Sequence, residues 1–219
     1  MFDQPNDLFH FYGYSGNVVV GQKVYVNSTG TKGGSSKFTK QKEWIGPGIF
    51  FRESMLKKGK VIPMPDINDK LPERAPSPGE TKRCVSSAED MIDFAVSMLG
   101  RNIDILTTKN VNGSKQSIMI GSIEGINGGK VTDAVSCHQL LFPYLLYYCH
   151  LVPKARVYQV DILDPNSKAK INNGVAICQM NTLGWNPTYE AFLALGSAPG
   201  QIEVCHWIFQ NDLTWTVVD

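Results

Sequence analysis

Residues 137–150 read CHQLLFPYLLYYCH and begin and end with the same dipeptide, Cys-His. The dipeptide recurs at residues 205–206, and Cys178-Gln179 occupies the corresponding place between these pairs. Ten residues separate the first two pairs, 27 the next two and 25 the last two. Three of the four histidines in the chain therefore follow directly on a cysteine, an arrangement that random placement would almost never produce.

The alternation of side chains along a β-strand gives this pattern a chemical meaning. Adjacent strand residues point to opposite faces, so each pair can place its cysteine on one side of a sheet and its histidine on the other. Cysteines on one face can form disulfides between strands, and histidines that converge on the other can bind copper or zinc. Disulfides with no metal, and histidines as mere polar neighbours, would also fit. The candidate ligands are His138, His150 and His206, and the candidate disulfide cysteines are Cys84, Cys137, Cys149, Cys178 and Cys205, whose pairing stays open.

The remaining patterns predict a helix followed by strands. Ser86 as N-cap and Glu89 form a capping box, apolar residues recur at helical spacing as far as Met98, and Gly100 supplies the stop. A shorter helix is expected around residues 52–57. The expected strands include alternation at 103–105 and 118–120 and the segments VTDAVSCH (131–138), ARVYQVDIL (155–163), GVAICQM (174–180), EAFLALG (190–196), IEVCHWIF (202–209) and TWTVV (214–218). The fold class predicted is α+β, mainly antiparallel β with an N-terminal helix.

Composition divides the 219-residue chain into an arm and a domain. Residues 1–43 are rich in Gly, Ser, Lys and aromatic side chains, which predicts an extended or disordered basic arm with a Phe-x-x-Tyr motif. Residues 44–219 form the expected domain, with a linker-like segment at 68–83. Residues 23–60 hold nine basic and two acidic groups, a charge of +7, whereas residues 61–219 hold 12 basic and 16 acidic groups, a charge of −4. Such an arm can bind a polyanion, or its lysines can simply maintain solubility.

Cysteine usage and sequons favour an oxidising compartment. The chain has five cysteines and two N-glycosylation sequons, at Asn27 and Asn112. Its first residues, MFDQPNDLF, lack the basic and apolar regions of a signal peptide. No window approaches 18 uninterrupted apolar residues, so we expect no membrane partner, and no nucleic-acid partner is expected either.

The spacing of the four dipeptides resembles the BURP domain of plant proteins, whose signature is four Cys-His pairs followed by a tryptophan, here Trp215. Further segments are similar to one branch of that family, the non-catalytic beta subunit of polygalacturonase. Among them are FFRESMLKKGKVIPMPDI (50–67), GETKRCVSSAEDMIDFA (79–95), PYLLYYCH (143–150) and IEVCHWIFQNDLTWT (202–216). The resemblance covers about residues 46–219 and implies a BURP domain with disulfide-linked strands.

The resemblance implies two different functions. In the beta-subunit branch it implies a secreted cell-wall glycoprotein of the apoplast that associates with polygalacturonase and pectin and has no hydrolase activity. The basic arm fits that function, because pectin is a polyanion. In another branch it implies a copper-dependent autocatalytic peptide cyclase, with Tyr12 and Phe9 of its own N-terminal peptide as the candidate substrate residues. We prefer the wall protein and keep the cyclase as the alternative.

Two departures from the family pattern bear on that choice. The resemblance implies copper ligands at the three histidines and at position 179, where the family has histidine and this chain has Gln179. An amide oxygen is a poorer copper ligand than imidazole, which counts against the enzyme. Relatives also carry a longer segment before Cys84, with a cysteine that could pair with it, whereas here the segment is short.

Overall fold

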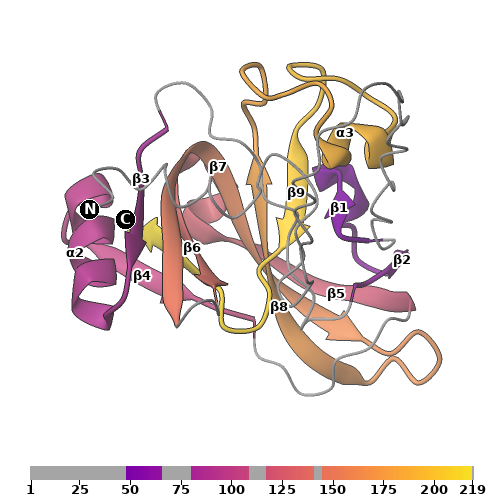
Figure 1. Ribbon diagram of the computed structural model, residues 1–219. Helices are drawn as coiled ribbons and strands as arrows, with labels where there is room; N and C mark the ends of the chain where they lie inside the picture. Colours follow the sequence, from indigo (N-terminus) through magenta and orange to yellow (C-terminus); the bar gives the residue numbers. More distant parts are fainter. Residues whose placement is uncertain (1–47, 66–79, 109–116, 141–144, 219) are drawn as a thin grey trace, which may run out of the picture. The chain divides into compact units, whose positions relative to one another are not determined.

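The computed structural model describes residues 48–65, 80–108, 117–140 and 145–218 (Figure 1). The chain divides into two units, Met1–Trp44 and Ile45–Asp219, and all of the described residues lie in the second. The predicted arm with Phe9 and Tyr12, and the sequons at Asn27 and Asn112, fall outside the described residues. So does most of the linker-like segment, although its end, Lys82 and Arg83, lies in a strand.

Antiparallel pairing organises the described part of the chain, as expected from the sequence. One sheet contains ten strands there, along a main path β1-β9-β8-β7-β6-β10-β4, with β2 on β5 and with β3 and β5 on β7. The strands are β1 (Phe50–Phe51), β2 (Val61–Pro63), β3 (Lys82–Val85), β4 (Ile103–Leu106), β5 (Ser117–Gly125), β6 (Thr132–Leu140), β7 (Leu146–Leu163), β8 (Lys170–Gln179), β9 (Val204–Trp207) and β10 (Leu213–Val217). The helices are η1 (Glu53–Met55), α2 (Ala88–Leu99), η2 (Ile126–Gly129) and α3 (Glu190–Leu195).

Strand β7 is the long central element in Figure 1. Its first half pairs with β6 and β3, and its second half pairs with β8 and β5. The register with β6 shifts between Thr132 and Ala134, opposite Lys154, whose φ is 53°. This irregularity changes which residues of β7 face each side of the sheet, because an extra residue reverses the alternation. Val152 before it and Ala155 after it therefore pack in the same apolar cluster.

The helix predicted between Ser86 and Gly100 is confirmed as α2, but two details of that prediction are wrong. Helix α2 is not N-terminal to the sheet, because β1, β2 and β3 precede it; those strands are two to four residues long, too short for a clear alternation. Its N-cap is Ser87 rather than Ser86, and the Ser87 hydroxyl accepts a hydrogen bond of 3.1 Å from the Asp90 amide.

The segment 190–196 is also not a strand. Residues 190–195 form α3, because Ala191 and Phe192 are buried on one side of a helical turn while Leu193 is 56% exposed. Gly196 ends the helix with φ 61°, a left-handed conformation that glycine adopts without strain. The helix expected at 52–57 is the shorter 3-10 helix η1. The other expected strand segments are confirmed as β4–β10.

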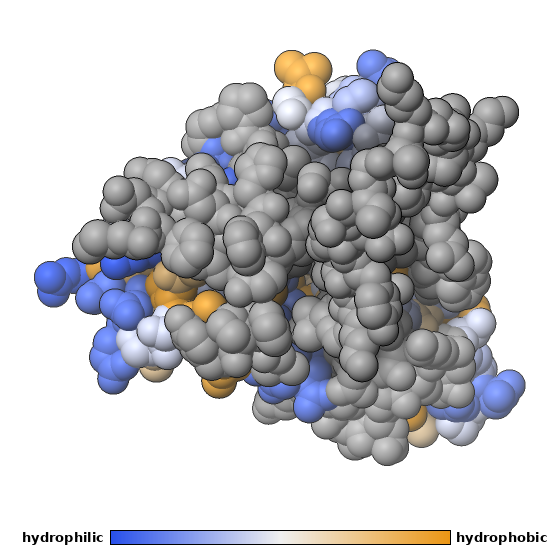
Figure 2. Space-filling view, viewed as in Figure 1, coloured by the Kyte–Doolittle hydropathy of each residue, from blue (hydrophilic) through white to orange (hydrophobic). Residues whose placement is uncertain are grey.

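The apolar core lies on both faces of the sheet. One face carries a cluster around Trp207 and Phe51 and another around Trp215 and the buried side of α2. The other face carries a cluster of small and branched residues from β6, β7 and β8. On the side shown in Figure 2, the visible described residues form small apolar areas that border hydrophilic ones. No helix within the described ranges is long and apolar enough to cross a membrane.

Candidate functional site

Two disulfides join neighbouring strands. Cys137 on β6 is bonded to Cys149 on β7, and Cys178 on β8 is bonded to Cys205 on β9. Each bond connects residues that lie directly opposite one another in the strand register. Cys84 belongs to neither bond and lies in β3 opposite Tyr148. The chain is thus a disulfide-linked β protein.

The residues that follow these four cysteines lie on the other face of the sheet. Ser136 pairs with His150, so His138, two residues along β6, is a diagonal neighbour of His150. Ile177 pairs with His206, so Gln179, two residues along β8, is a diagonal neighbour of His206. The sheet therefore brings all four sequence-predicted ligand positions to one face.

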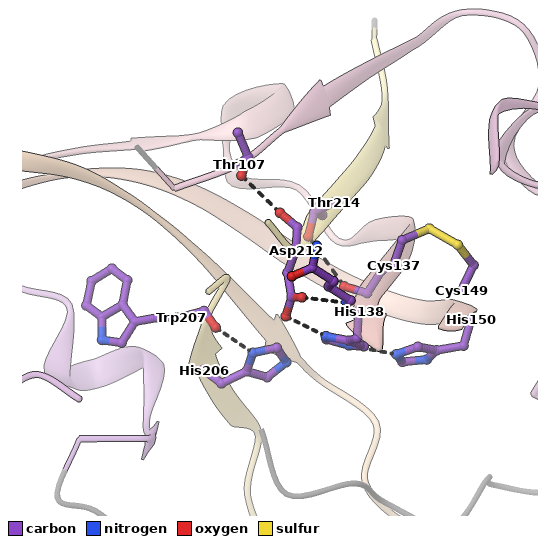
Figure 3. A network of polar contacts seen from close by, with 11 residues as sticks. Thr107, Cys137, His138, Cys149, His150, His206, Trp207, Asp212 and Thr214 are labelled. Carbon is purple, nitrogen blue, oxygen red and sulfur yellow. Dashed lines mark hydrogen bonds and ion pairs between the residues drawn. A yellow bond between two sulfur atoms is a disulfide. The ribbon is translucent and has the colours of Figure 1, made fainter. Parts of the chain in front are cut away.

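His138 and His150 form the closest pair of the site (Figure 3). Their rings stack with centroids 5.5 Å apart, and their Nε2 atoms are separated by 3.4 Å. The Nδ1 of His138 lies 2.8 Å from Oδ2 of Asp212, whose Oδ1 accepts a 2.9 Å hydrogen bond from the Gln139 amide. The Nδ1 of His150 lies 2.6 Å from Oε1 of Glu80. Both carboxylates are almost fully buried.

His206 approaches this pair from β9. Its ring centroid is 6.3 Å from that of His138, and its Nδ1 lies 3.0 Å from the Trp207 carbonyl oxygen. In Figure 3 the ring extends from that carbonyl toward His138. Burial, and to a smaller extent the nearby His138 and His150, lower the pKa of His206 to about 3, although the Trp207 carbonyl and Asp212 oppose the shift. His206 is therefore a neutral imidazole at neutral pH.

These contacts assign the same tautomer to all three histidines. A carboxylate or a carbonyl oxygen only accepts hydrogen bonds, so each Nδ1 carries the proton and donates it. In a neutral ring, each Nε2 then presents a lone pair. Two such lone pairs 3.4 Å apart cannot hydrogen-bond to each other and require a proton or a metal cation near them. The two carboxylates behind the rings add negative charge that favours a cation.

The positions of His138 and His150 suit a shared metal ion more closely than the position of His206 does. Two imidazoles bound to one ion at about 2.0 Å and at a tetrahedral angle have centroids about 5 Å apart. His138 and His150 are close to that separation, whereas His206 would have to move by about 1 Å toward His138. In the described ranges, no three His, Cys, Asp or Glu side chains stand together at metal-binding spacing.

Sequence reasoning missed both carboxylates. Glu80 lies in the segment that looks like a linker, and Asp212 follows a turn at Asn211, whose φ is 67°. Nothing in the spacing of either residue ties it to a histidine 70 or 74 positions away. A carboxylate behind a ligand histidine is the usual arrangement in metal sites, but only the fold shows which carboxylate takes that position.

The fold and site define a disulfide-linked antiparallel β protein with convergent histidines backed by carboxylates. Residues 70–217 match the BURP domain, and this chain belongs to that family. It is 57% identical to the polygalacturonase non-catalytic subunit AroGP2 of Solanum lycopersicum, in a match that covers 80% of this chain and 35% of that protein. It is 49% identical to the polygalacturonase 1 beta-like protein 3 of Arabidopsis thaliana, across 98% of this chain and 41% of that protein. The chain thus spans little more than a third of the length of these relatives.

Proposed function

We propose that this chain is a non-catalytic partner of polygalacturonase in the plant cell wall, with pectin as a second binding partner. The support is its identity of 55% to the polygalacturonase-1 non-catalytic subunit beta of Solanum lycopersicum. The two disulfides fit this location, because such bonds persist in oxidising extracellular surroundings. The proposal goes beyond the family itself, since the match covers 35% of that relative.

Mixing the purified chain with a plant polygalacturonase tests the first part of this proposal. We expect a complex in size-exclusion chromatography and no release of galacturonate by the chain alone. A mixture that elutes as two separate species at micromolar concentration would refute the partnership. Release of galacturonate by the chain alone would refute the non-catalytic role.

We also propose that His138, His150 and His206 hold a copper ion. The observation that carries this proposal is the set of three imidazoles whose Nδ1 protons are all engaged, which leaves three Nε2 lone pairs on one face. Nitrogen ligands of this kind suit copper, and bound copper supplies a one-electron redox couple at this place. Asp212 and Glu80 hold two of the rings in orientation, and the buried surroundings of His206 keep it neutral and able to bind.

Copper titration of the full chain in competition with a chelator tests this assignment. His138→Ala should weaken copper binding by at least about tenfold, because it removes one of the two closest ligands. His10→Ala is the matched control, since His10 is the one histidine of the chain that does not follow a cysteine. Equal copper affinity in the wild type and His138→Ala would refute the site.

A further inference from the structure

A turn between η1 and β2 carries three lysines in four positions, Lys57, Lys58 and Lys60, and all three are exposed. We refer to residues 57–60 as the lysine turn. We propose that the lysine turn is the docking site for a polyuronate chain, a linear polymer of sugar carboxylates such as pectate. This inference rests on the proposed association with pectin and names the part of the folded domain that makes it.

The backbone of the lysine turn is fixed on both sides. Leu56 before it and Ile62 after it are buried in the same apolar cluster. The Lys60 amide donates to the Lys57 carbonyl at 2.9 Å, which closes the turn. The Gly59 amide donates to the Ile120 carbonyl at 2.7 Å, and the Ile120 amide donates to the Lys60 carbonyl at 2.9 Å. A ligand therefore has only the lysine side chains to order, which lowers the entropy cost of binding.

Gly59 makes this tight geometry possible. Its φ of 81° lies in the region that residues with a Cβ rarely adopt. No atom lies within 4 Å of the place where a Cβ would stand, so the outer side of the turn is open. The three ammonium groups thus extend from a compact turn whose surface faces outward.

The positive charges of the turn are not neutralised by the described part of the domain. None of the three lysine side chains has an ion pair there. The Glu53 carboxylate, on the preceding 3-10 helix, binds Arg156 at 3.0 Å. Asp161, on the strand beside β5, binds Lys170 at 2.5 Å. Without the three lysines of the turn, residues 44–219 hold 13 basic and 17 acidic residues, a charge of −4, so the turn is a local basic site on an otherwise acidic domain.

These features favour a polymer with repeated carboxylates. A single exposed lysine–carboxylate pair contributes little, so a useful ligand must engage several lysines at once. Next to the turn, Val61 is 49% exposed and pairs with the half-buried Met119 on β5. Because Ile62 points into the core, alternation turns Val61 outward, where it offers apolar surface to the C–H faces of sugar rings.

Retention of the full chain on immobilised polygalacturonate, eluted with a salt gradient, tests the proposal. The variant K57Q/K58Q/K60Q should bind roughly 3- to 100-fold more weakly at low salt, the range expected for three exposed ion pairs. The variant K57R/K58R/K60R, which keeps the charges, should bind like the wild type. A charge-matched control, R83Q/K154Q/K168Q, removes three other exposed positive charges and should change binding less than about twofold.

The outcomes separate this inference from the proposed function. Equal losses in K57Q/K58Q/K60Q and in its control would show that net charge alone matters and would overturn the docking site. Wild-type retention of K57Q/K58Q/K60Q, together with loss in the arm variant K23Q/K32Q/K37Q, would overturn it while leaving pectin binding intact. Loss of polygalacturonase binding with pectate binding unchanged would assign the turn to an acidic protein surface instead. No pectate binding by the wild type would overturn both the inference and the pectin part of the proposed function.

Discussion

Replacement of Asp212 by asparagine tests the assignment of the histidine tautomers. The Asp212 carboxylate accepts one hydrogen bond from Nδ1 of His138 and one from the Gln139 amide. An asparagine side chain has one oxygen, so its NH2 group must face one of these donors. If it faces His138, Nδ1 must become the acceptor and the proton moves to Nε2, which can then no longer bind a metal. If it faces the Gln139 amide, a buried donor loses its partner, at a cost of about 1–3 kcal/mol.

We expect Asp212→Asn to lower copper affinity by about 10- to 100-fold, the usual effect of losing a partner behind a metal ligand. Chelator competition measures the affinity, and electron paramagnetic resonance of bound copper(II) shows whether the set of nitrogen ligands has changed. Asp93→Asn is the matched control, because Asp93 is exposed on α2. Asp212→Asn with wild-type copper affinity and an unchanged spectrum would show that the carboxylate does not orient His138, and the tautomer argument would then be wrong.

Further predictions concern the rest of the site and its supporting contacts. Replacing Cys137 and Cys149 by serine should lower the free energy of unfolding by about 3 kcal/mol in denaturant titrations, and copper affinity should fall with it. Gln179→His should raise copper affinity by about tenfold, or 1.4 kcal/mol, in chelator competition, because it adds an imidazole on the face of His206. Glu53→Gln should lower the free energy of unfolding by about 1–2 kcal/mol, since it weakens the bonds to Arg156 and Tyr158 at a partly exposed position. Burial and the Glu53 carboxylate raise the pKa of Tyr158 to about 12. The stabilisation from the protonated Tyr158 hydroxyl should therefore be complete below pH 10 and be lost between pH 10 and 12. Tyr158→Phe should remove this loss from a plot of the free energy of unfolding against pH.

The sequence predicts the strands around the site because their segments contain apolar and β-branched residues between turn signals. Strands β6, β8 and β9 contain Cys-His or Cys-Gln within mostly buried segments. The opposed faces of cysteine and histidine follow from the pleat alone. The irregularity at Lys154 could not be predicted in this way, because it depends on the register between two strands and not on the residues of one strand.

The wrong prediction for residues 190–196 and the missed strands β1–β3 also depend on contacts that a local sequence pattern does not contain. Residues 190–195 are apolar and short, and a short apolar segment fits a strand as well as a buried helical turn. The helical conformation is favoured here because it allows Phe192 to pack against the rings of both Trp185 and Tyr189. The short strands β1–β3 form because strands elsewhere in the chain pair with them. A strand of two to four residues is too short to be recognised from its own sequence pattern.

The Cys-His dipeptide links the disulfides to the histidine site through the register of the strands. A shift of one residue between β6 and β7 would turn His138 to the cysteine face and remove it from the site. The Cys137–Cys149 bond prevents that shift, because it joins the residues that are directly opposite in the correct register. The Cys178–Cys205 bond fixes the register of β8 and β9 in the same way, but there it positions one imidazole, His206, beside the amide of Gln179. In the proposed copper site, two imidazoles from one strand pair and one from the other would therefore make an unequal ligand set, in which the β6–β7 half would set most of the affinity.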